Sequence, residues 1–439
     1  MFRKSVLKVA PLALAAFTGA AFADDSSVTL YGVLDAAIAN IQHAYNFDPI
    51  MVSDNNPLIT KAPHSATGMF SGGLSATRWG IKGQEDIGGG VKAIFLLESG
   101  FNISSGAIGN AVYAVSRNTA AGGPNANGDS ALNGQLFARA AYVGLSSTDY
   151  GSITGGRNTS FMVDNLGLFD PLLGSYAFSP IGYSGAFGGG GYTEDSRVDS
   201  SLKYKISFGD FTVGALYKFG GVAGSSSSQG AYQLNAVYQS GPLAIGLGYE
   251  QFKDAFTVVN PNGTTQPIGT VVATAADTKA YMLGVKYKIQ DFTLRAGYER
   301  EQFTNPSNPT QDALTNTLYG TTVFSVNVAP FPNQKNFNVF WVGGGYDFTD
   351  KFTLMGAVYR VTQNAFGTGA VAGCSSTASA TCSGNTNYYS LVGDYHLSKR
   401  TDTYLGIMKE TASGGMAAGF VAPQEAANRT IALGFRHTF

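Results

Sequence analysis

Charged residues, cysteines and long apolar runs are all scarce in this chain of 439 residues. Only 13% of the residues are charged, although about a quarter is usual for a water-soluble protein. Beyond the first 23 residues no uninterrupted apolar run reaches about 18 residues, which excludes transmembrane helices. An excess of charge of one sign is also lacking, since the formal net charge is −1. This near-neutrality argues against nucleic acid as a partner.

Cysteine is limited to Cys374 and Cys382, in a stretch rich in Gly, Ser, Thr and Ala. Their spacing is not that of a metal or redox site and no histidine is nearby, so we expect neither a metal nor a redox centre. In an exported chain the compartment is oxidising, and the two thiols are expected to form a local disulfide. The small loop that it closes would contribute about 2–3 kcal/mol to stability.

Residues 1–23 have the features of a secretory leader. A basic start is followed by the apolar stretch from Val9 to Thr18, and Ala21-Phe22-Ala23 provides a cleavage site. We expect residues 1–23 to be removed as a signal peptide and residues 24–439 to form a single domain, because no linker or compositional break divides them. Loss of the three basic residues in the leader changes the net charge from −1 to −4.

Apolar and polar side chains alternate along the last ten residues. Ile431, Leu433, Phe435, His437 and Phe439 share one face of a strand, and small or polar residues occupy the other. Such a strand lies between an apolar and an aqueous environment. A terminal phenylalanine fits an aromatic girdle that faces lipid. An edge strand in a soluble sandwich is the alternative interpretation of this segment alone.

The same alternating hairpin recurs from end to end, most clearly from Val198 to Phe219. Short turn signals lie near residues 86–90, 149–151, 208–210, 241–242, 290–291, 349–351 and 398–400. Longer polar segments lie near residues 41–70, 102–133, 158–196, 221–230, 253–277, 302–335, 361–386 and 411–428. These seven turns and eight loops link sixteen strands. An even number of strands, with short turns on one rim and long loops on the other, predicts an all-β fold, a 16-stranded antiparallel transmembrane β-barrel. Gly, Ser, Thr and charged residues on the inward faces indicate an aqueous lumen and not a dry core.

Several motifs resemble the general-diffusion porins of Gram-negative bacteria, most closely those of beta-proteobacteria. They lie at residues 27–36, 78–93, 141–145, 150–152, 156–158 and 434–439. The resemblance implies a homotrimer in the cell outer membrane, in contact with outer-membrane lipid and lipopolysaccharide. It further implies passive diffusion of ions and small hydrophilic solutes through each barrel, with no cofactor and no enzyme activity.

The resemblance also implies a pore constriction, in which a third loop folds into the lumen and acidic residues on it face an arginine cluster on the wall. The matching arginines are Arg78, Arg157 and Arg197, with Arg139 as a further candidate. The candidate acids on the loop are Asp164, Asp170, Glu194 and Asp195. Phe169-Asp170-Pro171 replaces the Pro-Glu-Phe tripeptide of enterobacterial porins, so the acid that faces the arginines is open, and Asp170 is the first choice.

Guanidinium groups that face carboxylates across a narrow waist set up a transverse field, which orders water and favours hydrophilic solutes. Two unit charges about 8 Å apart, at an effective dielectric constant near 20, interact by about 2 kcal/mol. The alternative role is structural, with ion pairs that hold the loop against the wall, and the two roles are compatible. Charge selectivity stays open, because the net charge of −4 and the arginine-rich waist point in opposite directions.

Other function classes need features that the sequence offers weakly or not at all. A substrate-selective channel of the same fold would be favoured by a ladder of aromatic residues in the lumen. An outer-membrane lipase or protease needs a nucleophile beside a histidine, but His43 and His64 fall in the first loop and His396 and His437 at the periplasmic rim. Residues 188–191 are four glycines without the Lys-Ser/Thr of a phosphate-binding loop. A role as adhesin or phage receptor is not addressed by the sequence.

Overall fold

The computed structural model describes residues 26–42, 65–104, 106, 136–183, 197–255, 258–259, 271–273, 276–308, 331–367, 381–419 and 427–439. The strands are β1 (Ser27–Ile41), β2 (Ala66–Ser71), β3 (Arg78–Gly88), β4 (Val91–Gly100), β5 (Ala140–Ser147), β6 (Gly151–Thr159), β7 (Arg197–Phe208), β8 (Phe211–Lys218), β9 (Ala231–Ser240), β10 (Leu243–Ala255), β11 (Val258–Val259), β12 (Val271–Ala273), β13 (Ala276–Ile289), β14 (Phe292–Thr304), β15 (Lys335–Thr349), β16 (Phe352–Gln363), β17 (Gly384–Ser398), β18 (Thr401–Gly414) and β19 (Ala427–Thr438). The helices are α1 (Phe161–Phe169), α2 (Pro180–Tyr183) and the 3-10 helix η4 (Gly415–Gly419). The predicted signal peptide lies outside the described residues, as do Glu194, Asp195 and Cys374.

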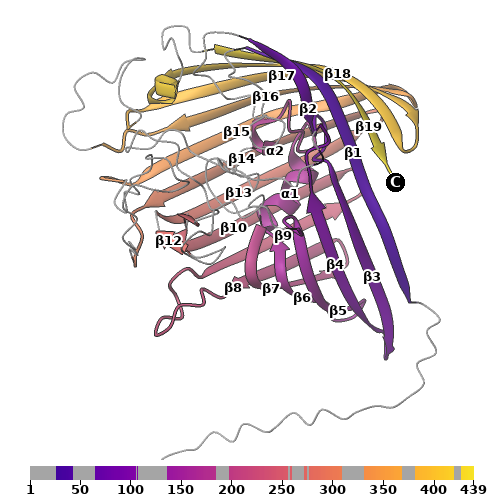
Figure 1. Cartoon of the computed structure of the whole chain (residues 1–439), viewed down its shortest axis with the longest axis vertical. Coiled ribbons are helices and arrows are strands. Elements are labelled where there is room, and N and C mark those ends of the chain that lie inside the picture. The colour runs from indigo at the N-terminus through magenta and orange to yellow at the C-terminus, as the bar shows by residue number, and fades with distance from the viewer. Residues whose placement is uncertain are drawn as a thin grey trace, which may run out of the picture.

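Neighbouring strands pair antiparallel, and the sheet closes where β1 meets β19, from Val33 opposite Thr438 to Ile41 opposite Thr430. Figure 1 shows these two strands, indigo and yellow, side by side. Both β2 and β3 pair with β1 and together occupy one position in the wall. The 17 segments of the described sheet therefore form a closed barrel of 16 strands, and the short hairpin of β11 and β12 stands apart. Closure satisfies the backbone groups at the sheet edges, as lipid requires.

Short turns and long connections alternate around the barrel, as the sequence predicts. The short turns lie at residues 89–90, 148–150, 209–210, 241–242, 290–291, 350–351 and 399–400. All three of Gly88, Gly89 and Gly90 in the first turn have a positive φ, which glycine adopts without strain. One prediction was wrong in part: β2 lies inside the predicted first loop and pairs with β1. Its six residues are too short and too rich in small side chains to show a clear alternation.

Outward side chains are apolar and exposed, and inward ones are buried or polar. In β19, Leu433 and Phe435 are 55% and 49% exposed, whereas Ala432, which precedes Leu433, is fully buried, and the terminal Phe439 is 41% exposed. The predicted lipid-facing side of the last strand is therefore confirmed. None of the helices among the described residues combines the length and hydropathy needed to cross a bilayer.

The described part of the third loop, residues 160–183, enters the barrel and includes α1 and α2 (Figure 1). Helix α1 packs against β9, β10, β13 and β14. Further along, the ring of Phe178 lies against Tyr404 of β18, and the backbone N–H of Ala177 donates to the carbonyl of Gly73 between β2 and β3 (2.9 Å). Contacts with strands on several sides of a closed wall are possible only from its interior.

Candidate functional site

The break between β2 and β3 is a turn organised by one buried carboxylate. Asp35 of β1 accepts hydrogen bonds from the backbone N–H groups of Gly73 (3.1 Å), Leu74 (2.9 Å) and Ser75 (2.7 Å). Three successive N–H groups converge on one carboxylate because Gly72 adopts a positive φ of 86°, which bends the chain inward. The result is a fixed turn at residues 72–77.

This turn holds the third loop. The carbonyl of Gly73 accepts from the hydroxyl of Ser175 (2.8 Å) and from the N–H of Ala177 (2.9 Å). The hydroxyl of Tyr404 donates to Asp35, and its ring packs edge-on against Phe178 of the loop. One network therefore connects the wall, the turn and the loop.

The N-terminal end of α1 is anchored by polar side chains of the wall. Ser160 caps the helix, and its hydroxyl accepts from the N–H of Val163 (3.1 Å). The side-chain amide of Asn165 donates to Asn235 of β9 (2.8 Å). The bond between Asn165 and Asn235 is buried, so the helix is fixed in one position on the wall.

The C-terminal end of α1 is held by donors from the opposite strands. The indole N–H of Trp341 donates to the carbonyl of Phe169 (2.9 Å), and Nε of Arg295 donates to that of Leu168 (3.1 Å). The ring of Phe169 packs against β10 and β13 at positions that glycine occupies. A Cβ at Gly284 would overlap this ring. The absence of side chains on the wall therefore lets the loop approach closely.

Asp170 follows α1 directly and turns toward β16. Its carboxylate accepts from the hydroxyl of Tyr359 (2.6 Å) and from the N–H of Gly174 (2.6 Å). Burial raises the pKa of the Asp170 carboxyl, while these hydrogen bonds act in the opposite direction. The prediction that Asp170 faces the wall arginines is wrong, because it closes the turn after the helix on the other side of the lumen.

Arg78 and Arg139 share one carboxylate, that of Glu98 on β4. Nε of Arg139 donates to Glu98 at 2.6 Å, and Nε of Arg78 lies 3.6 Å from the same carboxylate. The hydroxyl of Tyr31 donates to it as well (2.7 Å). Tyr176 of the third loop lies within electrostatic range of Arg139, so a tyrosine of the described part of the loop reaches this part of the wall.

The other two arginines lie nearby. Arg157 forms an ion pair with Asp199 of β7 and donates to the carbonyl of Ala138 (2.6 Å). Arg197 is buried and lies within electrostatic range of Arg139 and Arg157. The structure thus brings together the four arginines that the sequence singles out.

Asp164 faces the wall near the start of the third loop. Its carboxylate pairs with Nζ of Lys203 on β7 (2.6 Å) and accepts from the hydroxyl of Thr159 (2.7 Å). Nζ of Lys203 also lies 4.5 Å from the centre of the Phe161 ring. Of the predicted loop acids that the structure describes, Asp164 is the one that contacts a wall cation.

Sequence reasoning missed Glu98, Asp199 and Lys203 as members of this site. Together with the arginines they give five cations and three acids on this side of the lumen, including Asp164. A signal was present, because Asp199 and Lys203 occupy the polar face of a predicted strand. Glu98 interrupts an apolar stretch on β4.

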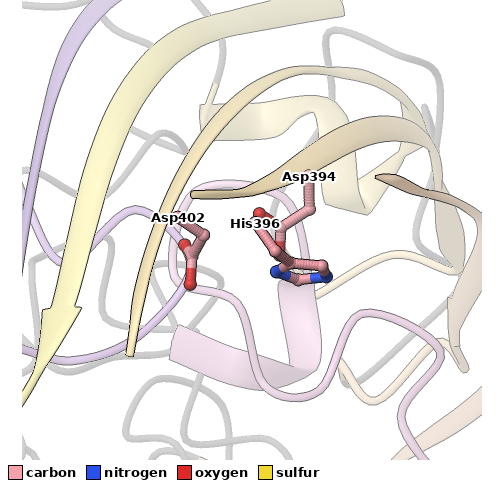
Figure 2. A group of neighbouring side chains, drawn as sticks. All are labelled: Asp394, His396 and Asp402. Atoms are coloured by element: carbon pink, nitrogen blue, oxygen red, sulfur yellow. The ribbon is translucent and has the colours of Figure 1, made fainter. Parts of the chain in front are cut away.

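A second charged cluster lies toward the periplasmic rim. Figure 2 shows Asp394 and His396 of β17 beside Asp402 of β18, with one ligand-type atom of each within 4.8 Å of the others. Arg436 of β19 already provides the positive charge there, since its guanidinium donates to Asp402 (3.0 and 3.1 Å) and lies 3.4 Å from Asp394. Asp394, His396 and Arg436 line a cavity of about 280 Å³, together with Leu172 of the third loop. The expectation that the chain binds no metal stays a prediction.

Cys382 is buried and takes part in a disulfide. Its predicted partner, Cys374, lies outside the described residues. The side-chain amide of Gln363 donates to the carbonyl of Cys382 (2.6 Å), which ties this end of the seventh loop to β16.

Known proteins share this architecture. An anion-selective porin from Comamonas acidovorans superposes with a TM-score of 0.63 at 20% identity, over 94% of this chain and 100% of the other. A trimeric form of OmpT, an outer membrane protein of Vibrio cholerae, gives a TM-score of 0.58 at 17% identity, over 95% and 100% of the two chains.

Two proteins of similar sequence are outer membrane porins. An outer membrane porin protein of Bordetella pertussis is 28% identical over 456 aligned positions, which cover 99% of this chain and 100% of the relative. Outer membrane porin protein 32 of Delftia acidovorans is 31% identical over 58% of this chain and 61% of its own length. The family model for Gram-negative porins matches residues 10–415. The chain therefore belongs to the Gram-negative porin family.

Proposed function

We propose that the third loop and the arginine wall form the constriction of this outer-membrane porin, and that the passage between them prefers anions. The loop is fixed by apolar packing and hydrogen bonds to β9, β10 and β13–β18, and it presents polar groups, Asp164 and Tyr176, toward β3–β7. Water and hydrophilic solutes then pass between a polar loop edge and a charged wall.

The observation that carries the proposal is the excess of cations over acids on that wall. Arg78, Arg139, Arg157, Arg197 and Lys203 face three carboxylates, those of Glu98, Asp199 and Asp164. Among the described side chains of this wall the cations outnumber the acids, and in a narrow passage with low-dielectric walls such an excess of positive charge concentrates anions. The net charge of −4 belongs to the mature chain as a whole and does not describe this wall. The porin of Comamonas acidovorans with the same fold is anion-selective, which supports the assignment.

The test is the reversal potential of the purified protein in a planar bilayer under a gradient of potassium chloride. We expect the sign of the reversal potential to be that of a channel more permeable to chloride than to potassium. R139Q removes one of the five cations of this wall and should move the potential toward zero. A reversal potential of the opposite sign, that of a channel more permeable to potassium than to chloride, would overturn the proposal.

A substrate-selective channel is the second candidate, and the described aromatics do not favour it. The large inward-facing aromatics Trp341, Tyr359, Tyr388 and Tyr404 are buried against the third loop or the wall and are not available to a passing solute. Saturation of flux by a single solute would establish this candidate in place of general diffusion.

We also propose that the protein is not an enzyme, since its relatives are porins, and that it assembles as a homotrimer in contact with lipid and lipopolysaccharide. Removal of residues 1–23 belongs to the same proposal. Amino-terminal sequencing of the purified protein should begin at Asp24, and a retained leader would contradict this assignment.

A further inference from the structure

Two acids and one histidine lie together on the inner wall of the barrel, toward the rim of the short turns. Asp394 and His396 are alternate residues of β17, so both point to the same face of the sheet. Strand pairing places Asp402 of β18 directly opposite His396. One ligand-type atom of each residue lies within 4.8 Å of the other two (Figure 2). The register of one hairpin therefore assembles two carboxylates and one imidazole.

One oxygen atom of this cluster is buried without a partner among the described residues. Only 5% of the side chain of Asp394 is exposed, and its Oδ1 accepts no hydrogen bond from the part of the chain that the structure describes. A buried carboxylate oxygen that lacks a donor or a cation is costly and rare. Because Asp394 lines the cavity of about 280 Å³, a ligand that enters the cavity can reach this side chain.

Arg436 of β19 does not supply that partner. Its Nε and Nη2 donate to Asp402 (3.1 and 3.0 Å), and its Nη1 donates to Ser75 (3.0 Å). These bonds fix the guanidinium, and none of its nitrogens donates to Oδ1 of Asp394. Asp35 of β1 lies directly opposite Arg436, so three carboxylates surround this one arginine. The excess of negative charge within this group of residues favours a second cation.

We propose that Asp394, His396 and Asp402 bind a divalent transition-metal ion of the Zn²⁺ type. Imidazole and carboxylate are ligands that Zn²⁺ accepts together, whereas Mg²⁺ and Ca²⁺ prefer oxygen ligands alone. Zn²⁺ holds such ligands at about 2.0–2.2 Å, so two of them lie no more than about 4.4 Å apart. The observed spread of up to 4.8 Å therefore needs at most a small rotation of the side chains.

The ion enters from the periplasm. His396 and Asp402 flank the short turn at residues 399–400, and short turns face the periplasm in barrels of this class. His396 is half-buried, so its ring is accessible from this rim. A bound ion adds positive charge to the inner wall below the third loop.

The site departs from the expectation, drawn from the sequence, that the chain binds no metal. That expectation considered the spacing of the cysteines, whereas these ligands lie on two strands and come together only through strand pairing. The inference concerns binding to the wall, so it depends neither on ion selectivity nor on the arrangement at the constriction.

The experiment is a calorimetric titration of the purified, tag-free protein in detergent with zinc chloride. We expect H396Q to weaken zinc binding at least about 10-fold, because even the loss of a group that only orients a metal ligand costs about 10–100-fold in affinity. The control is H437Q, which removes a histidine of the same rim that contacts Thr401 (2.9 Å) and shares the outward face with Phe435. It should bind zinc like the parent. Magnesium chloride in tenfold excess should leave zinc bound.

Three results would overturn the proposal. Zinc could bind H396Q as tightly as the parent, or H437Q could lose as much affinity as H396Q. Magnesium could displace zinc, which would identify an unspecific attraction of cations to the acids. If circular dichroism shows that H396Q does not fold, D394N serves as the second variant. It keeps the shape of the side chain and removes its charge, and the expected loss is again at least about 10-fold.

Discussion

At the scale of single residues, Glu98 controls the charge of the constriction, because it is the carboxylate that Arg78 and Arg139 share. The variant E98Q leaves both guanidinium groups without that counter-charge. We expect the ratio of anion to cation permeability to rise roughly threefold, since salt screens most of the Coulomb energy. Reversal potentials measure this ratio.

The matched control is E85Q, which removes an exposed carboxylate from β3 at the end of the short turns. Its reversal potential should equal that of the parent. A shift of equal size in both variants would show that Glu98 acts only through the overall charge of the protein.

Asp35 gives a second prediction at this scale. The variant D35N places an amide N–H₂ where three backbone N–H groups converge, so we expect the free energy of unfolding to fall by about 1–3 kcal/mol. The third loop is hydrogen-bonded to the same turn. Because a loosened turn holds the loop less firmly, the current noise of the open channel should increase. Thermal melts and single-channel records measure the two effects. D210N, in an exposed turn, is the control. A D35N channel as quiet and as stable as the control would contradict the role of this carboxylate.

The sequence predicted the four arginines correctly as neighbours but not their partners. The arginines lie in motifs whose spacing along a strand fixes their position. Asp170 was misplaced because its direction depends on the length of α1 and on contacts with Tyr359, far away in the sequence. Glu98 was missed because the family resemblance points to acids on the third loop and not on a strand. The partners of a strand residue lie on other strands, and the alternation of side chains along one strand does not identify them.

At the scale of elements, the seating of α1 depends on glycines in β10 and β13. A Cβ at residue 284 would overlap the ring of Phe169, so G284A should push α1 away from the wall and into the passage. Overpacking of this kind costs about 1–3 kcal/mol of stability. We expect a lower melting temperature and a smaller single-channel conductance.

G356A on β16 is the control for this prediction, because the nearest atom to its new Cβ, the carbonyl oxygen of Ser390, lies at an ordinary 3.6 Å. Its conductance should match that of the parent. Full conductance in G284A would mean that α1 does not border the passage.

Strands were predictable at this scale because alternation has a period of two and six of the seven short turns carry Gly or Asp. The helix in the third loop was not predicted, because α1 lacks a strongly apolar stripe and derives its order from the wall around it. The interruption between β2 and β3 was missed for a similar reason: it is fixed by Asp35, which lies about 40 residues earlier.

At the scale of the whole molecule, many large apolar side chains are exposed on the outward face of the strands, and the proposed homotrimer can be tested directly. We expect bands of oligomeric size in unheated detergent gels, which collapse to the monomer of 45.9 kDa, less the leader, on boiling. Migration as a monomer without heating would contradict the trimer.

The central claim is that the closed wall of sixteen strands encloses water and that the third loop narrows the passage without sealing it. Single-channel recording of the purified protein in a planar bilayer tests this most directly. The account predicts discrete, stepwise openings that conduct ions at low voltage, with chloride favoured over potassium. Insertion of folded protein without any open conductance would contradict it.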